Sequence, residues 1–274
     1  MTRHVLIDQM TWTDYDERVR TENPLVILPV GSLEQHGPHT PLGTDTIIPT
    51  AISTAAAERV GAMVAPPIAY GYKSQARTGG GNHFAGTTSL DGETLIHMTR
   101  DIIKEFARHG VRNMVVMDSH YENEMFLIEG IDLALRELRA DGNEDMKIVK
   151  IRYFEFTSDE TMGIVFPNGF PGWPLEHAGV MTTSVMLHLH PELVQMDRVP
   201  DHPPVQYPPY DVFPADPATG SPSGVLASAR GASAEKGKRL FDEYVAGISK
   251  ALSVEFKLGA RTPEARASTG TVRQ

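Results

Sequence analysis

The sequence contains no cysteine among its 274 residues. This absence excludes disulfide bonds, thiolate metal sites and cysteine nucleophiles, and nothing points to an oxidising compartment. Long apolar runs are missing as well, because no window approaches about 18 uninterrupted apolar residues and the first residues lack the apolar stretch of a secretory signal. Positive charge is scarce, with 25 lysines and arginines against 35 aspartates and glutamates. We therefore expect a cytoplasmic protein that binds neither nucleic acid nor a membrane, since both need clustered positive charge.

Short apolar runs alternate with longer helical patterns along most of the chain, and 41% apolar residues suffice to bury a core. Runs too short for helices predict strands over 25–30, 62–65, 111–117 and 146–153. Apolar residues at helical spacing predict helices over 11–20, 46–60, 92–109, 123–140, 180–189 and 232–258. Asp91 is placed to cap the third of these helices. Because parallel strands need crossover connections, the pattern predicts a single-domain, layered α/β/α fold with a mainly parallel sheet.

The stretch 199–224 is dominated by proline and lies between the last two expected helices. Proline favours extended backbone, so a flexible linker is one interpretation. Tyr207, Tyr210 and Phe213 favour the other, an ordered arm that packs on its own subunit or on a neighbour. We expect one domain over residues 1–258 that includes this arm, followed by a disordered tail over 259–274, where small polar residues are frequent.

Carboxylates and histidines gather after two of the expected strands. Glu34, His36 and Asp45 follow the first strand on irregular backbone, and His120 and Glu122 follow the third. Ligands of such folds bind beyond the carboxyl ends of the strands, although the sequence does not show that these two strands are neighbours. Ordinary loop polarity and a helix-capping Asp45 explain each residue taken singly. Together the five predict two divalent ions of the zinc or manganese type that share a bridging carboxylate, a centre suited to hydrolysis.

Other patterns with catalytic meaning are incomplete or ambiguous. His120-Tyr-Glu122 matches part of a zinc deaminase motif, but the cysteines of that motif are missing. The glycine run 79–81 lacks the lysine of a phosphate loop, and fits either a mobile loop near a pocket or a plain surface loop. Trp173 offers a face for a flat ligand and His177 can move protons near neutral pH. A core tryptophan and a hydrogen-bonded histidine would give the same pattern.

Longer motifs resemble the creatininase family over about residues 4–257. They include Leu-Pro-Val-Gly-Ser-Leu-Glu-Gln-His-Gly, Gly-Gly-Gly-Asn-His-Phe, His-Tyr-Glu-Asn and Pro-Pro-Tyr-Asp-Val-Phe-Pro. The resemblance implies a creatininase-type fold, a homohexamer built as a trimer of dimers, and two divalent ions per subunit, zinc or manganese or both. It also implies a creatinine amidohydrolase, which opens the cyclic amide of creatinine to give creatine in a reversible reaction.

The resemblance also assigns roles to the predicted metal ligands. It places Glu34 and His120 on one ion, His36 and Glu122 on the other, and Asp45 between the two.

Further roles concern the substrate. The resemblance makes Tyr121, Trp173 and Phe154 the substrate-binding residues. His177 and Glu122 would be catalytic, with His177 moving the proton. The chain departs from the family pattern at Phe154, where the family carries a tryptophan, and at Pro174, where it carries an aspartate.

These two departures leave the substrate open. We expect creatinine or a similar small cyclic amide, and the alternative is another cyclic amide or a formamide. A non-enzymatic protein that binds a small molecule and keeps the metals for structure is the alternative from a different class.

Overall fold

The computed structural model describes residues 4–217 and 220–258. Four strands form one sheet in the order β2-β1-β3-β4, and every neighbouring pair is parallel. The strands are β1 (Leu25–Val30), β2 (Met63–Val64), β3 (Asn113–Asp118) and β4 (Lys147–Arg152). The predicted α/β class, parallel sheet and layered arrangement are confirmed.

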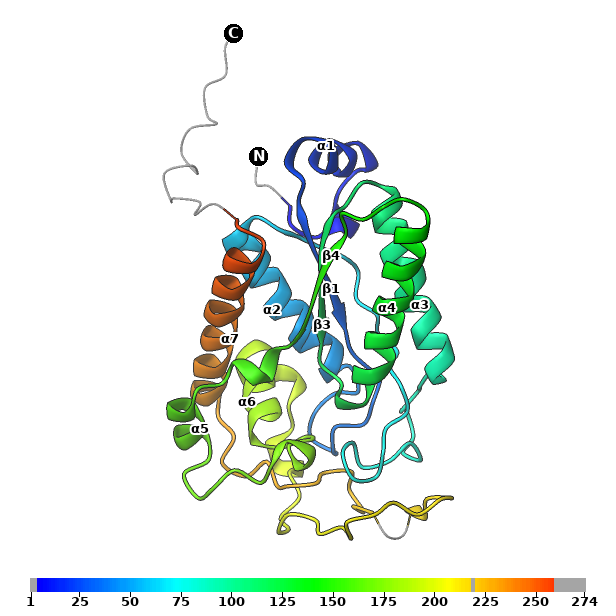
Figure 1. The fold of residues 1–274 in the computed structure, drawn as a ribbon. Helices are drawn as coiled ribbons and strands as arrows, with labels where there is room; N and C mark the ends of the chain where they lie inside the picture. Colours follow the sequence, from blue (N-terminus) through cyan, green and yellow to red (C-terminus); the bar gives the residue numbers. More distant parts are fainter. Residues whose placement is uncertain (1–3, 218–219, 259–274) are drawn as a thin grey trace.

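Helices cover both faces of the sheet, as Figure 1 shows. On one face lie α2 (Thr44–Val60), α6 (Val180–Leu189) and α7 (Ala234–Glu255), and on the other lie α3 (Gly92–Arg108) and α4 (Glu124–Ala140). The remaining α-helices are α1 (Trp12–Glu22) and α5 (Asp159–Val165). Short 3-10 helices are η1 (Ile7–Gln9), η2 (Tyr121–Asn123), η3 (Tyr153–Phe156), η4 (Trp173–Leu175), η5 (Pro191–Leu193) and η6 (Met196–Arg198).

The continuous apolar run of β1 follows from this layering. Leu25 and Ile27 pack into the cluster formed with α2, α6 and α7, whereas Val26 and Leu28 pack into the cluster formed with α3 and α4. Successive side chains of a strand point to opposite faces, so a strand covered on both sides is apolar at every position. All six residues of β1 are buried.

The strand order places a topological switch point between β1 and β3. The chain leaves β1 toward β2 on one side and returns to add β3 on the other, and Val30 lies in register with Asp118. Crevices at such switch points, beyond the carboxyl ends of the strands, are where parallel sheets bind ligands. The segments that follow β1 and β3, which carry the predicted metal ligands, are therefore side by side.

Several predicted boundaries need correction. Asp45 is in the first turn of α2 instead of on irregular backbone, because the helix begins at Thr44. Asp91 stands at the N-terminus of α3, but its side chain makes no capping hydrogen bond and pairs with Lys73 instead. Helix α5 was not predicted, although Ser158, whose side chain accepts from the backbone N–H of Thr161, gives an N-cap signal in the sequence.

The segment 199–224 lies at the carboxyl end of the strands (Figure 1), where its described part contains no α-helix or strand. Tyr207 packs on its own subunit, with its hydroxyl donating to the carbonyl of Ala76 at 2.7 Å. The side chains of Tyr210 and Phe213 are 62% and 78% exposed. The predicted tail over 259–274 lies outside the described residues. No helix in the described part of the chain is long and apolar enough to cross a membrane.

Candidate metal centre and substrate pocket

Four of the predicted metal ligands meet in the interior beyond β1 and β3. Glu34, His36, Asp45 and His120 are each at most 6% exposed. Nδ1 of His120 is 2.9 Å from Oε2 of Glu34. Burying this many ionisable groups is costly unless opposite charge or a metal ion compensates them.

The carboxylate of Asp45 lies between the two histidines. Its Oδ1 is 3.1 Å from Nε2 of His36, and its Oδ2 is 3.2 Å from Nδ1 of His120. One oxygen thus faces each histidine, which is the arrangement that a carboxylate shared by two cations requires. The position of Asp45 on the first turn of α2 adds the positive end of a helix dipole beside this negative group.

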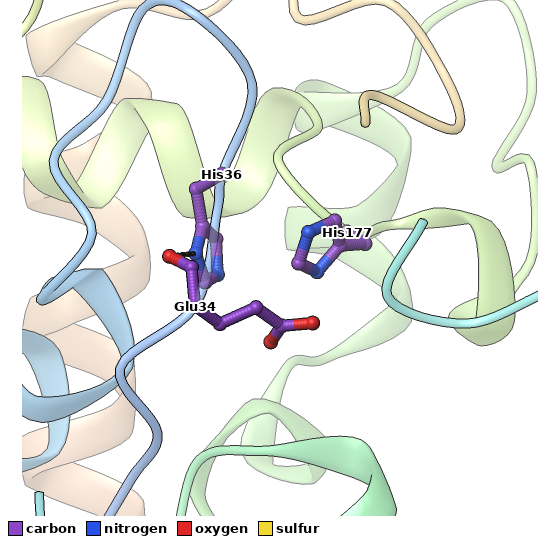
Figure 2. A group of neighbouring side chains, drawn as sticks. All are labelled: Glu34, His36 and His177. Carbon is purple, nitrogen blue, oxygen red and sulfur yellow. Dashed lines mark hydrogen bonds between the residues drawn. The ribbon is translucent and has the colours of Figure 1, made fainter. Parts of the chain in front are cut away.

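Two groups of side chains in the described residues bring potential ligand atoms within 4.8 Å of one another. One group is Glu34, Asp45 and His120, and the other is Glu34, His36 and His177. Figure 2 shows the second group, with the Glu34 carboxylate extending toward the His177 ring. The His36 and His177 rings face each other with centroids 4.4 Å apart.

Glu122 lies beside these groups without belonging to either. Its Oε2 is 3.5 Å from Nε2 of His120. Its Oε1 accepts hydrogen bonds from the backbone N–H of Gln75, at 3.0 Å, and from the hydroxyl of Thr78. Glu122 thus lies beside His120, whereas His177 belongs to the group with Glu34 and His36. The predicted role of Glu122 as a metal ligand stays a prediction.

The residues fit a metal ion on two observations besides their chemistry. Within the described residues, the buried Oε1 of Glu34 has no hydrogen-bond partner. A Cβ on Gly79 would stand 2.3 Å from this Oε1 and 3.1 Å from Oε1 of Glu122. Glycine thus lets the backbone approach both carboxylates. Histidine with carboxylate is a donor set suited to zinc and manganese.

The electrostatics of the centre follow from burial and close charges. Burial raises the pKa of the Glu34 carboxyl above its usual range, although nearby His120 opposes this shift. Burial alone would lower the pKa of His36, but Asp45 and Glu34 together outweigh burial and raise that pKa to about 9. The pKa of Asp45 is held below its usual range, against burial, by His36 and His120. The histidines thus hold positive charge where a divalent cation would place it.

His177 behaves in the opposite way. Burial and the positive charge of His36 hold its pKa well below the usual range, so the ring is neutral at physiological pH. Nε2 of His177 is 2.8 Å from the backbone carbonyl oxygen of Gln35. If Nε2 carries the proton and donates it to this carbonyl, Nδ1 is left with a free lone pair, as a proton acceptor requires.

A pocket opens next to these groups. It is a cavity of ≈ 70 Å³ whose walls include Tyr121, Phe154, Trp173, His120 and His177. The Phe154 and Trp173 rings pack at 5.1 Å between centroids with a tilt of 36°. The three predicted substrate-binding residues therefore share one cavity with predicted metal ligands. Pro174, the second departure from the family pattern, lies directly after Trp173 in η4.

Some residues of the site had no predicted role. The side-chain amide of Gln35 donates to the carbonyl of Gly79 at 2.8 Å and to that of Gly224 at 3.1 Å, and this joins the glycine loop to the end of the arm. Thr78 and Glu176 line the pocket. Burial raises the pKa of Glu176 to about 8. Of the two interpretations of the glycine run, the structure favours a loop near the pocket.

Comparison with known proteins gives the class of the chain. The sequence profile of the family described as creatininase, creatinine amidohydrolase, matches residues 8–252. The chain therefore belongs to the creatininase family.

Among curated relatives, the creatinine amidohydrolase of Pseudomonas putida is 52% identical over 93% of this chain and 99% of its own length. The mycofactocin precursor peptide peptidase of Mycobacterium ulcerans is 33% identical over 81% of this chain and 82% of its own length.

Solved creatininase structures have the same fold. A manganese creatininase is 52% identical with a TM-score of 0.91, and a glutamate-to-glutamine mutant of Zn-Zn type is 51% identical with a TM-score of 0.92. The same kind of mutant complexed with creatine is 51% identical with a TM-score of 0.91. Each alignment covers 93% of this chain and 99% of the other.

Proposed function

We propose that this protein is a creatinine amidohydrolase, which hydrolyses creatinine to creatine in a reversible, metal-dependent reaction. The observation that carries the proposal is the position of an aromatic pocket directly beside a buried cluster of carboxylates and histidines. The identity of 52% to the Pseudomonas putida enzyme over nearly the whole chain supports the choice of substrate. The solved mutant creatininase that holds creatine supports it as well.

Two divalent ions, zinc or manganese or both, are the proposed cofactors. Glu34 and His120 would hold one ion, and Asp45 would contribute one carboxylate oxygen to each. His36 and Glu122 would hold the other ion. A potential ligand atom of His177 also lies within 4.8 Å of those of Glu34 and His36. When bound, such ions polarise a carbonyl and lower the pKa of water. The Zn-Zn and manganese forms of related creatininases support this assignment.

The pocket residues would orient the substrate. Phe154 and Trp173 present adjacent faces that suit a planar ring, and Tyr121 forms another part of the wall. Because the pocket opens beside the carboxylate cluster, a ring held there can turn its carbonyl carbon toward that cluster.

His177 would move the proton. Hydrolysis forms a bond between the carbonyl carbon and a water oxygen, breaks the bond to the ring nitrogen, and transfers a proton from the water to that nitrogen. A neutral His177 can accept this proton and deliver it to the departing nitrogen. Glu122, beside His120 and anchored by Gln75 and Thr78, is the second proposed catalytic residue.

The remaining proposals concern organisation. We infer one domain over residues 1–258, a cytoplasmic location, and a homohexamer built as a trimer of dimers. The exposed apolar side chains of Tyr210, Val212 and Phe213 support assembly through the arm. Sedimentation of the purified protein would test the subunit number.

A substrate panel tests the function. Purified protein loaded with zinc or manganese would be assayed on creatinine, hydantoins, lactams and formamides, and metal content would be measured in parallel. We expect turnover of creatinine and two ions per chain. Turnover of another cyclic amide or of a formamide alone would keep the proposed metal-dependent hydrolysis and change only the proposed substrate. Hydrolysis of none, with metals bound, would favour a non-enzymatic binding protein.

A further inference from the structure

The guanidinium of Arg152, the last residue of β4, lies beside two aromatic rings that line the pocket. Its guanidinium carbon lies 5.9 Å from the centre of the Tyr121 ring and 5.7 Å from the centre of the Phe154 ring. The two rings come from different elements, since Tyr121 begins η2 after β3 and Phe154 lies in η3 after β4. A guanidinium within about 6 Å of a ring centre is attracted to the ring face.

Two carboxylates hold this guanidinium in place. Nη1 of Arg152 donates to Glu124 at 2.7 Å, and Nη2 donates to Glu155. The side chain is 20% exposed, so solvent screens these contacts only in part. Arginine stays charged throughout the physiological range, and its planar fork orients all of these contacts at once.

The two rings differ in their other support. Phe154 also packs against Tyr153 and Trp173, with ring centroids 5.5 Å and 5.1 Å away. Tyr121 is 38% exposed, so a larger part of its surface faces solvent. Loss of the guanidinium would therefore free Tyr121 more than Phe154.

We propose that Arg152 is a positioning residue that fixes the Tyr121 and Phe154 rings in the wall of the pocket, where a flat substrate would bind. The inference rests on the proposed function and names a residue that sets substrate affinity without contacting the substrate. The sequence shows Arg152 only as the last polar residue of an expected strand. Its role depends on Tyr121, which is 31 positions away in the chain but follows Asp118, the register partner of Arg152, by three residues.

Steady-state kinetics of full-length Arg152→Met provide the test. The variant keeps the apolar stem of the side chain and loses the guanidinium with its charge. We expect the KM for creatinine to rise roughly 3- to 30-fold, as the loss of ring contacts predicts, with kcat and metal content within about twofold of wild type. Arg152→Lys should recover part of the affinity, because it keeps a cation but loses the planar fork.

A matched control lies at the other end of the same strand. Nζ of Lys147 is 5.4 Å from the centre of the Phe256 ring and 2.6 Å from Glu255, and Lys147 is absent from the residues that line the pocket. Lys147→Met therefore removes one ring contact and one ion pair of the same kind. We expect it to leave KM unchanged, whatever its effect on the melting temperature.

Near-ultraviolet circular dichroism gives a readout that needs no turnover. The Tyr121 and Phe154 rings lose a charged neighbour in Arg152→Met, and Phe154 packs on Trp173, whereas Trp12 is 79% exposed and contributes little to such a spectrum. Arg152→Met should change the aromatic bands and Lys147→Met should not. An unchanged spectrum and KM in Arg152→Met, or a parallel loss of kcat and metal, would overturn the proposal. Wild-type protein inactive on creatinine would instead contradict the proposed function, while the spectra still decide the role of Arg152.

Discussion

Replacing Gly79 by alanine is the most direct probe of the candidate metal centre. The added Cβ would lie 2.3 Å from Oε1 of Glu34 and 2.4 Å from Oγ of Ser74. Ordinary contacts between such atoms need about 3.5 Å, so the loop and the carboxylate must separate by roughly 1 Å. Glu34 is fully buried, and its Oε2 lies 2.9 Å from Nδ1 of His120. A shift of the carboxylate would disturb that contact, and a shift of the loop would disturb the hydrogen bond from Gln35 to the carbonyl of Gly79.

The size of the effect follows from this displacement. Misplacing groups at a reacting centre by about 1 Å can cost roughly 100-fold in rate, and disturbing the residues around metal ligands typically costs about 10- to 100-fold in metal affinity. We expect Gly79→Ala to lose activity and metal affinity by these factors. Metal titration followed by calorimetry, together with kcat/KM for creatinine, would measure both.

Gly163 provides the control for this experiment. It lies within α5, and a Cβ there would meet no atom within 4 Å. Alanine is favoured over glycine inside a helix by about 1 kcal/mol, so Gly163→Ala should be neutral or slightly stabilising. If Gly79→Ala bound two ions with wild-type affinity and kept its activity, the close approach of this loop to the ligands would have no functional meaning.

Further expectations concern other parts of the protein. Asp45→Asn should abolish activity and lower the metal content, as measured by elemental analysis, because in the proposed centre both ions would share that carboxylate for charge compensation. Phe154→Trp should lower mainly the KM for creatinine, by a factor equivalent to roughly 0.5–2 kcal/mol of stacking, with metal content unchanged; an effect on another cyclic amide alone would reassign the substrate. Burial and the positive charge of His36 lower the pKa of His39 from 6.5 to about 4. As the pH falls, His39 is protonated in the unfolded chain before it is protonated in the folded protein. Its contribution to the free energy of unfolding is therefore complete above pH 6.5 and is lost as the pH falls toward 4. His39→Gln should flatten that part of a plot of melting temperature against pH. Deletion of 207–213 should reduce the assembly seen by sedimentation, and an unchanged sedimentation coefficient would count against a role for the arm.

Local patterns predicted much of the fold. The apolar run of β1 stops at Val30, directly before Gly31, and the strand was predicted with its observed limits. Six apolar residues in a row are too few for a helix. Helix α6 was also predicted with its observed limits. The first turn of α2 was missed because Thr44 and Asp45 have no apolar periodicity of their own.

The candidate site was predictable only in part. The predicted ligands after β1 and β3 do lie close together, but that depends on the pairing of those strands, which no local pattern specifies. The contacts of His177 with Gln35 and His36 join residues more than 140 positions apart in the chain. Such contacts arise from packing across the whole molecule, so neither the hydrogen bonds of Gln35 nor the position of Arg152 behind Tyr121 could be predicted.

The two sides of the site come from different parts of the chain. All five predicted metal ligands and the pocket residue Tyr121 lie within the first 122 residues, whereas the other predicted pocket residues, Phe154, Trp173 and His177, follow β4. Substitutions in the later part can thus reshape the recognition of a substrate while the earlier part keeps its charges and buried geometry. Changes at Phe154 or Trp173, unlike changes at His177, would leave the proposed hydrolytic residues in place, so such a chain could reach new substrates by small steps. Relatives of the chain are indeed named as acting on different substrates, one as a creatinine amidohydrolase and another as a peptide peptidase.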